Sequence, residues 1–421
     1  MPAQEEGAIV RKIGLTGWIF IGILLGAACG HLIGKPLLAV SQPMGTVFLT
    51  LLKMVIVPLI LSSIITGVAG IGDTGRLGRM GAKTLVYYLT TSLLAILTGL
   101  MIVNLVKPGV GAELGLAPLK EEIAAEGTGV LDILLRMIPE NPVQAAAEGR
   151  MLPLIFFAII FGVFITRVEN ETGRPVQSFI AGVFEVMMKM TRFIIHLTPF
   201  GAFGLVGSIV ARTGFAPFIP LGKYAACVVA ALAIHGCLTL PLLLRFVGGI
   251  NPVKHIKAMA PALMTAFSTA SSSATLPLTM ECAEARAGVS NRTSSFVLPL
   301  GATVNMDGTA LYECVAVMFI AQYYFSHGQH DPLTLAQQTV VVLTALLASI
   351  GAAGIPLAGL VMMSVCLHAV GLPLAGIGLI LAVDQVLDMC RTTINVWSDS
   401  CGTVIIASTE GETGIKVRAG R

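Results

Sequence analysis

Long apolar segments separated by short polar ones run through most of the 421-residue chain. Six of them have the length and hydropathy expected of membrane-spanning helices. They lie at roughly 13–34, 44–70, 84–106, 130–168, 177–210 and 221–247, and the fourth is interrupted. The first segment is too long for the core of a signal peptide, so we expect it to be retained as a helix. This pattern predicts an all-α polytopic membrane protein.

Beyond residue 258 the apolar segments are interrupted by small and polar residues. Three serines at 271–273 lie inside one apolar segment, and several glycines between 351 and 359 lie inside another. Each segment is followed by a helix with Asn and Asp in its interior, at 305–309 and 395–399. Paired broken segments are typical of secondary transporters built from repeats, because a non-helical turn at membrane depth presents free N–H and C=O groups to ions. Packing of small residues between helices is the alternative for the serines.

One predicted helix carries three carboxylates and one guanidinium. At about 100° per residue, positions 384, 388, 391, 392, 395 and 399 fall on a stripe roughly 100° wide. A charge buried at membrane depth costs about 3 kcal/mol. A structural ion pair between Asp388 and Arg391 would account for two of the charges but not for Asp384 and Asp399. The stripe therefore indicates a face that meets an ion, a zwitterion or water.

Composition narrows the possible classes of protein. Hydrophobic residues make up 55% of the chain and charged residues 12%. Soluble domains carry about 25% charged residues, so a soluble single-domain fold is excluded. The net charge of +3 is spread along the chain and does not indicate a nucleic-acid partner, and none of the eight cysteines has metal-ligand spacing. For His196, His235 and His368 a buried structural role is the favoured interpretation, and a proton carrier is the alternative.

Clusters of basic residues predict the orientation in the membrane. They precede the first span, separate the second from the third, follow the sixth and close the chain. By the positive-inside rule these regions face the cytoplasm, and so do both termini. We therefore expect a multi-pass protein of the plasma (inner) membrane in contact with the lipid bilayer. The acidic, proline-containing segment 107–150 suits an extracellular loop.

Four motifs resemble the dicarboxylate/amino acid:cation symporter family, which includes the excitatory amino acid transporters and prokaryotic glutamate/aspartate transporters. They are Ser271-Ser-Ser-Ala-Thr-Leu-Pro277, Asn305-Met-Asp-Gly-Thr309, the glycine segment 351–359 and Asp388-x-x-Arg391-Thr-x-x-Asn395-Val-x-x-Asp399. Weaker similarity covers nearly the whole chain. The resemblance implies a homotrimer that works as an elevator-type transporter. Each subunit would have eight membrane helices plus two re-entrant helical hairpins, arranged as inverted repeats.

The same resemblance implies a static scaffold and a moving transport domain. Residues 1–83 would form scaffold helices one and two, 84–107 transport-domain helix three, 108–220 the extracellular loop with scaffold helices four and five, and 221–421 the rest of the transport domain. Within the last part we expect the first hairpin at about 258–285, helix seven at about 292–325, the second hairpin at about 334–370 and helix eight at about 374–408. The first hairpin would enter from the cytoplasm, and the second would enter from outside as the gate.

Uptake of L-glutamate and L-aspartate coupled to sodium and protons, with no organic cofactor, is the function that the resemblance implies. A guanidinium fork fits the side-chain carboxylate of such a substrate and a lone carboxylate fits its ammonium group, which agrees with Arg391 and Asp388 in these roles. The substrate-binding residues implied are Ser271, Ser272, Thr309, Ile355, Gly359, Asp388, Arg391, Thr392 and Asn395. The sodium ligands implied, which offer oxygen atoms, are Tyr88, Thr91, Ser92, Gly301, Thr303, Asn305, Asp307, Ser349, Ile350, Asn395 and Asp399. Glu313 resembles a proton-carrying glutamate.

The sequence departs from the family's pattern at three positions. Ala270 and Met389 stand where different branches carry an accessory arginine, and Ser398 stands where glycine is usual. Other functions remain open. A C4-dicarboxylate symporter would not need Asp388, a neutral amino acid exchanger would leave Arg391 unpaired, and a channel would need neither partner. An enzyme is not indicated, because no nucleophile–base pair is visible.

Overall fold

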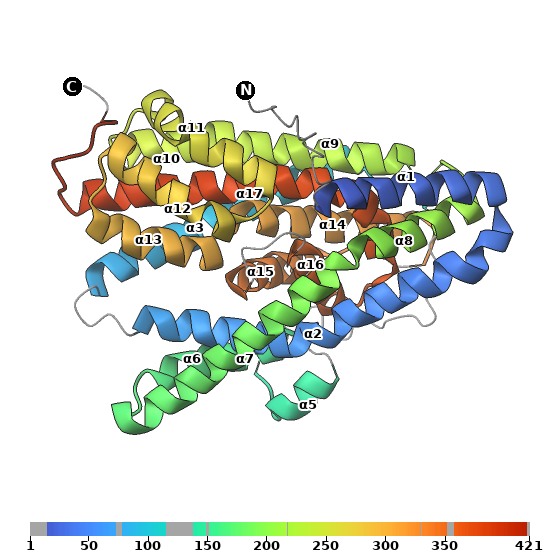
Figure 1. The fold of residues 1–421 in the computed structure, drawn as a ribbon, viewed down its shortest axis with the longest axis horizontal. Coiled ribbons are helices and arrows are strands. Elements are labelled where there is room, and N and C mark those ends of the chain that lie inside the picture. Colours follow the sequence, from blue (N-terminus) through green and yellow to red (C-terminus); the bar gives the residue numbers. More distant parts are fainter. Residues whose placement is uncertain are drawn as a thin grey trace, which may run out of the picture.

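The computed structural model describes residues 15–72, 78–114, 138–148, 151–216, 218–329, 331–351 and 358–418. Every element named within these ranges is a helix, which confirms the all-α prediction (Figure 1). Within these ranges, Ile250 and Arg418 form an isolated antiparallel β-bridge. All eight cysteines are free thiols.

The first half of the chain forms long, apolar helices. They are α1 (Leu15–Ile33), the short 3-10 helix η1 (Lys35–Leu37), α2 (Leu38–Gly72), α3 (Gly78–Val106), α5 (Pro142–Ala147), α6 (Met151–Ile165), α7 (Asn170–His196) and α8 (Thr198–Thr213). The segment 177–210, predicted as one span, is divided between α7 and α8, which meet at an angle of 52°. Pro199 lies just after this junction and has no N–H group to continue the helical hydrogen bonding.

The second half consists of shorter helices with frequent breaks. They are α9 (Phe218–Ile234), the π-turn η2 (His235–Thr239), α10 (Leu240–Phe246), α11 (Pro252–Thr269), α12 (Ser272–Glu281), the π-turn η3 (Cys282–Ala287), α13 (Asn291–Val304), α14 (Asp307–Ser326), α15 (Leu335–Gly351), α16 (Ala358–Ala369) and α17 (Ala375–Thr409). Helices α11 and α12 pack against each other, as do α15 and α16. These two pairs cover the segments predicted as hairpins.

Three described helical segments are long and apolar enough to cross a membrane, at residues 79–106, 218–246 and 291–326. The bent pair α7–α8 counts as a fourth if it forms one span. The apolar window of 291–326 is wholly buried inside the protein. This window therefore runs through the interior, where its polar residues meet other helices instead of lipid.

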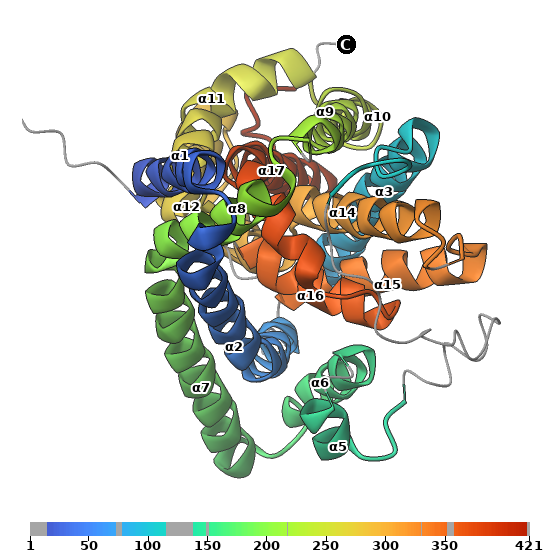
Figure 2. The ribbon, with the colours of Figure 1, turned by 90° about the vertical axis from the view of Figure 1, so that its right-hand side faces the viewer.

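Helices α14 and α17 occupy the centre of the larger group of helices. Helix α14 packs against α3, α9, α15, α16 and α17, and α17 packs in addition against α11 and α13. Helices α2, α5, α6 and α7 lie to one side of this group (Figure 1 and Figure 2). All side chains from Asp307 to Tyr324 of α14 are buried. The polar residues that the sequence singles out on α14 and α17 therefore face each other in the interior.

Glycines allow α1 to pack directly on the backbone of α8. Gly22, Gly26 and Gly30 recur every four residues along one face of α1, and this spacing is typical of close helix contacts in membranes. A Cβ atom added at any of them would lie within 2.8 Å of a backbone atom of α8. Larger residues at these positions would force the two helices apart.

The segment after α17 is anchored to the base of α12, η3 and α13. The carboxylate of Glu412 accepts hydrogen bonds from the Ser290 backbone N–H at 2.8 Å, and from the hydroxyls of Ser290 and Thr293 at 2.6 Å each. Glu410 accepts hydrogen bonds from Arg79 at 2.9 Å and Lys83 at 2.5 Å, both on α3. Hydrogen bonds from Arg79 and then Lys83 lower the pKa of Glu410 to about 2. These contacts join the start of α3 to the end of α17. Both helices carry site residues further along their length.

Candidate functional site

A two-residue break between α13 and α14 forms the centre of the site. Asn305 and Met306 have non-helical backbone angles, and α14 begins at Asp307. The N–H of Gly308 is left without a partner in its own helix and donates to Asn395 Oδ1 on α17 at 2.8 Å. A Cβ atom on Gly308 would lie 2.5 Å from the carbonyl oxygen of Arg391. Glycine at 308 therefore permits the close approach of α14 and α17.

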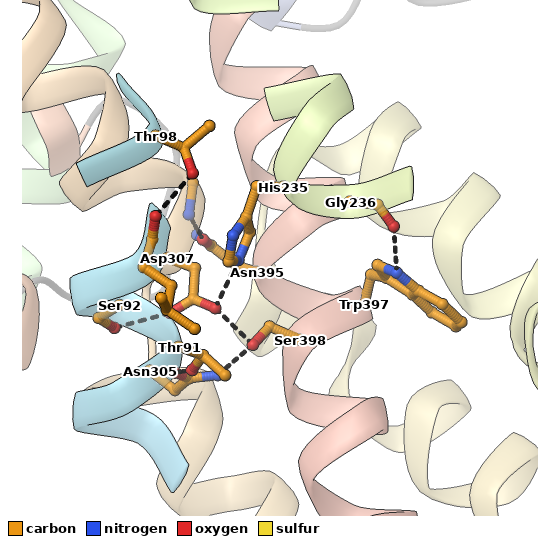
Figure 3. Close-up of polar contacts among 12 residues, drawn as sticks. Thr91, Ser92, Thr98, His235, Gly236, Asn305, Asp307, Asn395, Trp397 and Ser398 are labelled. Atoms are coloured by element: carbon orange, nitrogen blue, oxygen red, sulfur yellow. Dashed lines mark hydrogen bonds and ion pairs between the residues drawn. The ribbon is translucent and has the colours of Figure 1, made fainter. Parts of the chain in front are cut away.

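The carboxylate of Asp307 is fully buried and held by three side chains from three other elements (Figure 3). Ser92 of α3 donates to Oδ1 at 2.6 Å. Ser398 of α17 donates to Oδ2 at 2.6 Å, and His235 of η2 contacts the same oxygen through Nε2 at 3.1 Å. Apart from His235, no basic side chain of the described residues forms an ion pair with Asp307.

A second carboxylate, Asp399, lies next to the break. Asn305 donates from Nδ2 to Asp399 Oδ1 at 2.9 Å, and its own amide oxygen accepts from Thr91 at 3.3 Å. A Cβ atom on Gly301 would lie 2.5 Å from Asp399 Oδ1 and 2.7 Å from the Tyr88 hydroxyl oxygen. The C-terminal end of α13, helix α3 and helix α17 therefore bring these predicted sodium ligands together.

Arg391 forms the charged centre of a separate cluster on α17. Its Nη1 donates to Asp384 Oδ1 at 2.9 Å, and its Nε donates to Asp388 Oδ1 at 2.9 Å, with Nη2 at 2.8 Å from the same oxygen. The ring of Tyr312 lies 4.0 Å from Arg391 Cζ, and its hydroxyl donates to Asp384 at 2.6 Å. A Cβ atom on Gly359 would lie 3.0 Å from Cζ, so the guanidinium packs closely against this glycine. The ion pair between Asp388 and Arg391, an alternative at the sequence level, is thus present.

Carboxyl groups outnumber basic groups in the buried interior. The buried acidic side chains of the described residues are Asp307, Glu313, Asp384, Asp388 and Asp399, whereas Arg391 is the buried arginine and no lysine is buried. A buried charge is tolerated when it is paired or binds an ion. The arrangement therefore favours the uptake of cations or protons into this region.

Glu313 lies six residues after Asp307 on α14 and is fully buried. The thiol of Cys366 on α16 contacts its Oε2 at 3.8 Å. Carboxylate-bearing side chains in apolar surroundings of this kind can bind and release a proton. The geometry is compatible with the predicted proton-carrying role.

The predicted substrate residues that the structure describes are mostly buried. Asn395 donates to the Thr309 hydroxyl at 3.2 Å, and Thr392 is buried beside them on α17. Ser271 caps α12, where its hydroxyl accepts from the N–H of Ala274 at 3.2 Å. Ser272, the first residue of α12, is also buried. Ile355 lies outside the described residues.

The predicted third sodium site is less well assembled. Thr303 is exposed, and its hydroxyl donates to the carbonyls of Leu300 at 3.0 Å and Pro299 at 3.4 Å in its own helix. The hydroxyl of Ser349 likewise donates within α15, to Leu346 at 2.8 Å. Ile350 follows it in α15. The contacts of the described residues therefore do not join these positions to Asp307 or Asp399.

The sequence does not indicate the contacts of three side chains that shape the site. A structural core role is the favoured interpretation of His235 from the sequence, and no pattern in the sequence singles out Tyr312. No partner was assigned to Asp384, which is bound by Arg391 and Tyr312. No spacing in the sequence relates His235 to Asp307, because the two lie 72 residues apart. The position of Asp384 on the polar stripe of α17 is the sequence feature that indicates a polar partner for this carboxylate.

The sequence matches a known protein family over most of its length. The sequence model of the sodium:dicarboxylate symporter family matches residues 15–409. The chain is 35% identical over 412 residues to the proton/sodium-glutamate symport protein of Geobacillus stearothermophilus, covering 96% of both chains. It is 34% identical over 402 residues to the proton/glutamate-aspartate symporter of Escherichia coli, covering 93% of this chain and 90% of the relative. It is 37% identical over 420 residues to human excitatory amino acid transporter 3, covering 86% of this chain and 78% of the relative. These matches confirm the resemblance of the four motifs, and the chain belongs to the sodium:dicarboxylate symporter family.

Proposed function

We propose that this protein is a secondary active symporter that takes up L-glutamate and L-aspartate together with sodium ions and protons. The observation that carries the proposal is the pairing of two buried clusters that α17 forms with α14. One holds Arg391 between two carboxylates, and the other holds Asp307 and Asp399 without an arginine or lysine among the described residues. The first cluster suits an acidic zwitterion and the second suits cations. The glutamate symporters and excitatory amino acid transporters named above support this assignment.

Substrate binding would exchange partners within the Arg391 cluster. The side-chain carboxylate of the substrate would replace Asp388 at the guanidinium, which binds carboxylates bidentately. Asp388 would then be free to accept the substrate ammonium group. Each buried charge keeps an opposite charge beside it throughout, so the exchange avoids the cost of leaving a charge unpaired. Thr309, Thr392 and Asn395 would add hydrogen bonds, and the backbone near Ser271, Ser272, Ile355 and Gly359 would bind the remaining substrate atoms.

Cations would bind beside Asp307 and Asp399. Ser92 contacts the first, and Asn305, which accepts from Thr91, contacts the second. Gly301 and Tyr88 also lie close to the second. All offer oxygen atoms, which suit a hard cation such as sodium. Asn395 bonds to Gly308 and Thr309, so it would act at the boundary between the cation and substrate sites. A third site would use Thr303, Ser349 and Ile350.

Replacement of either cation-site carboxylate should raise the sodium concentration needed for substrate binding. For Asp307→Asn and Asp399→Asn we expect an increase of about tenfold or more in the half-saturating sodium concentration, because each variant removes a charged contact worth about 1.5–3 kcal/mol. The measurement is binding of labelled L-aspartate to purified protein in sodium–choline mixtures. Asp331→Asn, outside the helices, is the matched control. Saturable aspartate binding in choline alone, at constant pH, would contradict the cation role.

Glu313 would carry a proton through the cycle. With Glu313→Gln we expect the pH dependence of transport to disappear and net uptake to fall at least tenfold, because the neutral amide cannot release a proton, while exchange of internal for external aspartate persists. Proteoliposomes at acid and alkaline internal pH allow both to be measured. Glu185→Gln, at an exposed position of α7, is the matched control. Net uptake equal to that of the parent at every pH would assign Glu313 a structural role.

The finer architecture follows from the same proposal. The chain would form a homotrimer in the plasma (inner) membrane, with both termini in the cytoplasm and eight membrane helices per subunit. The pairs α11–α12 and α15–α16 would be the two re-entrant hairpins, and the moving domain would consist of α3 and residues 221–421. The polar breaks at the ends of α11 and α13 support this division.

One experiment tests the function as a whole. Purified protein in proteoliposomes is given a sodium gradient, a proton gradient, both or neither, and uptake of labelled L-aspartate is followed. We expect accumulation above the external concentration with a sodium gradient and stronger accumulation with both. Equilibration without accumulation in every case would indicate a channel or an exchanger.

A further inference from the structure

The side chain of Ser398 joins the two carboxylate groups of the cation region. Its hydroxyl donates to Asp307 Oδ2 at 2.6 Å and accepts from Asn305 Nδ2 at 3.1 Å (Figure 3). The same Asn305 nitrogen donates to Asp399 at 2.9 Å. Ser398 is fully buried. One hydroxyl therefore lies between the Asp307 group and the Asn305–Asp399 group.

The position of Ser398 is fixed by contacts on both sides of it. The hydroxyl of Tyr87, on α3, donates to the Ser398 carbonyl at 3.1 Å. The indole N–H of Trp397, one residue earlier, donates at 3.0 Å to the carbonyl of Gly236 in the π-turn that carries His235. Helix α17 is thus held against α3 and η2 at this level. The backbone that carries the Ser398 hydroxyl is therefore fixed beside Asp307.

The two oxygens of Asp307 are used unequally. A carboxylate offers about four lone-pair positions. Oδ2 accepts from Ser398 and lies 3.1 Å from His235 Nε2, whereas Oδ1 accepts from Ser92. A cation that approaches Asp307 therefore meets one oxygen whose lone pairs are already engaged and one that has room.

We propose that the Ser398 hydroxyl acts as a built-in substitute for the cation at Asp307 and so lowers the sodium affinity of this site. The inference rests on the proposed function. A hydrogen bond to an ionised carboxylate is stronger than one to a carboxylate that a cation has already partly neutralised. The Ser398 contact therefore stabilises the cation-free form more than the cation-bound form. Ser398 is a positioning residue in this sense, because it sets the sodium concentration at which the site fills.

Removal of the Ser398 hydroxyl should raise the affinity of the protein for sodium. Ser398→Ala removes the donor, so sodium should bind more tightly, with a half-saturating concentration about three- to tenfold lower than in the parent. Ser398→Thr keeps a hydroxyl and should stay close to the parent. Ser400→Ala is the matched control, because Ser400 is buried on the same helix and donates to the Trp397 carbonyl at 2.8 Å. A serine that ligated sodium directly would give the opposite sign.

Intrinsic fluorescence provides a readout that does not depend on transport. The chain has two tryptophans, Trp18 and Trp397, and the second lies next to Ser398. In a Trp18→Phe background, fluorescence of the full-length purified protein is titrated with sodium chloride at constant ionic strength. Thermal unfolding is then measured with and without sodium. For Ser398→Ala we expect the lower sodium midpoint and a larger gain in Tm on adding sodium than in the parent.

The possible outcomes distinguish this role of Ser398 from the proposed function. An unchanged or higher sodium midpoint in Ser398→Ala overturns the inference, and so does a fall in Tm that is equal with and without sodium, which marks a purely structural serine. If Ser398→Ala does not fold, Ser398→Gly is titrated by the same criteria. If sodium changes neither the fluorescence, the Tm nor the aspartate binding of the parent protein, the proposed cation coupling itself is refuted. The inference about Ser398 then fails with it.

Discussion

Replacing Arg391 with cysteine should abolish binding of L-glutamate and L-aspartate while allowing small neutral amino acids such as L-serine to bind. The guanidinium is the one buried arginine or lysine cation among the described residues. Without its bidentate, charge-assisted hydrogen bonds to the substrate carboxylate, affinity should fall about a hundredfold or more. Binding of labelled aspartate, and its competition by serine, measures both effects. Unchanged aspartate affinity would remove Arg391 from the substrate site.

This variant needs a second one beside it, for a structural reason. Removal of Arg391 leaves Asp384 and Asp388 without their common partner. Two buried carboxylates that have lost their arginine counter-ion are destabilising, and a misfolded protein would also fail to bind aspartate. The double variant Arg391→Cys with Asp384→Asn removes one of these charges, and the amide oxygen at position 384 can still accept from Tyr312. We expect it to fold, to bind serine and to reject aspartate.

Asp388→Asn should lower the affinity for amino acids by at least about tenfold and keep the sodium response. The asparagine side chain has no charge to offset the substrate ammonium group, whereas the cation cluster at Asp307 of α14 and Asp399 of α17 is unaltered. Asp384→Asn is the matched control, since it removes the other carboxylate that contacts Arg391. We expect the control to change aspartate affinity less than Asp388→Asn does.

Succinate distinguishes the amine role from a general charge effect. It carries two carboxylates and no ammonium group, so an Asp388 that recognises the amine should make it a poor ligand of the parent. Competition between succinate and labelled aspartate for purified protein measures this directly. If succinate competes as well as unlabelled aspartate does, the chain is a C4-dicarboxylate symporter and Asp388 has another role.

Most of the architecture could be predicted from the sequence because membrane proteins follow strong local rules. Hydropathy predicted the apolar helices, and the interruptions at Asn305 and near Ser271 predicted where helices would break. The carboxylate stripe on α17 also predicted which face would be polar. These features depend on the 3.6-residue period and on the cost of burying polar groups, and both are properties of a single segment.

What could not be predicted depends on contacts between distant segments. The bend at Leu197 is not predicted, because Pro199 alone does not show that the two halves of the segment pack differently. Helix α8 packs against α1 and α2, whereas α7 packs against α2. His235 contacts Asp307 because the π-turn η2 packs between α3 and α17. Ser398 was noted as a departure from the usual glycine, yet its bond to Asp307 depends on how α14 and α17 cross. Such relations require the three-dimensional arrangement.

The excess of buried carboxyl groups has an electrical consequence. Displacing one elementary charge through the full membrane potential involves about 2.3 kcal/mol per 100 mV. In the proposed elevator cycle, bound cations and protons neutralise Asp307, Asp399 and Glu313 during the inward movement. The more complete this neutralisation is, the less the inward movement depends on the membrane voltage. The carrier that returns without cargo is negative, and an interior-negative potential drives negative charge outward. The cell's membrane voltage would thereby speed the resetting of the transporter, in addition to the ion gradients that load it.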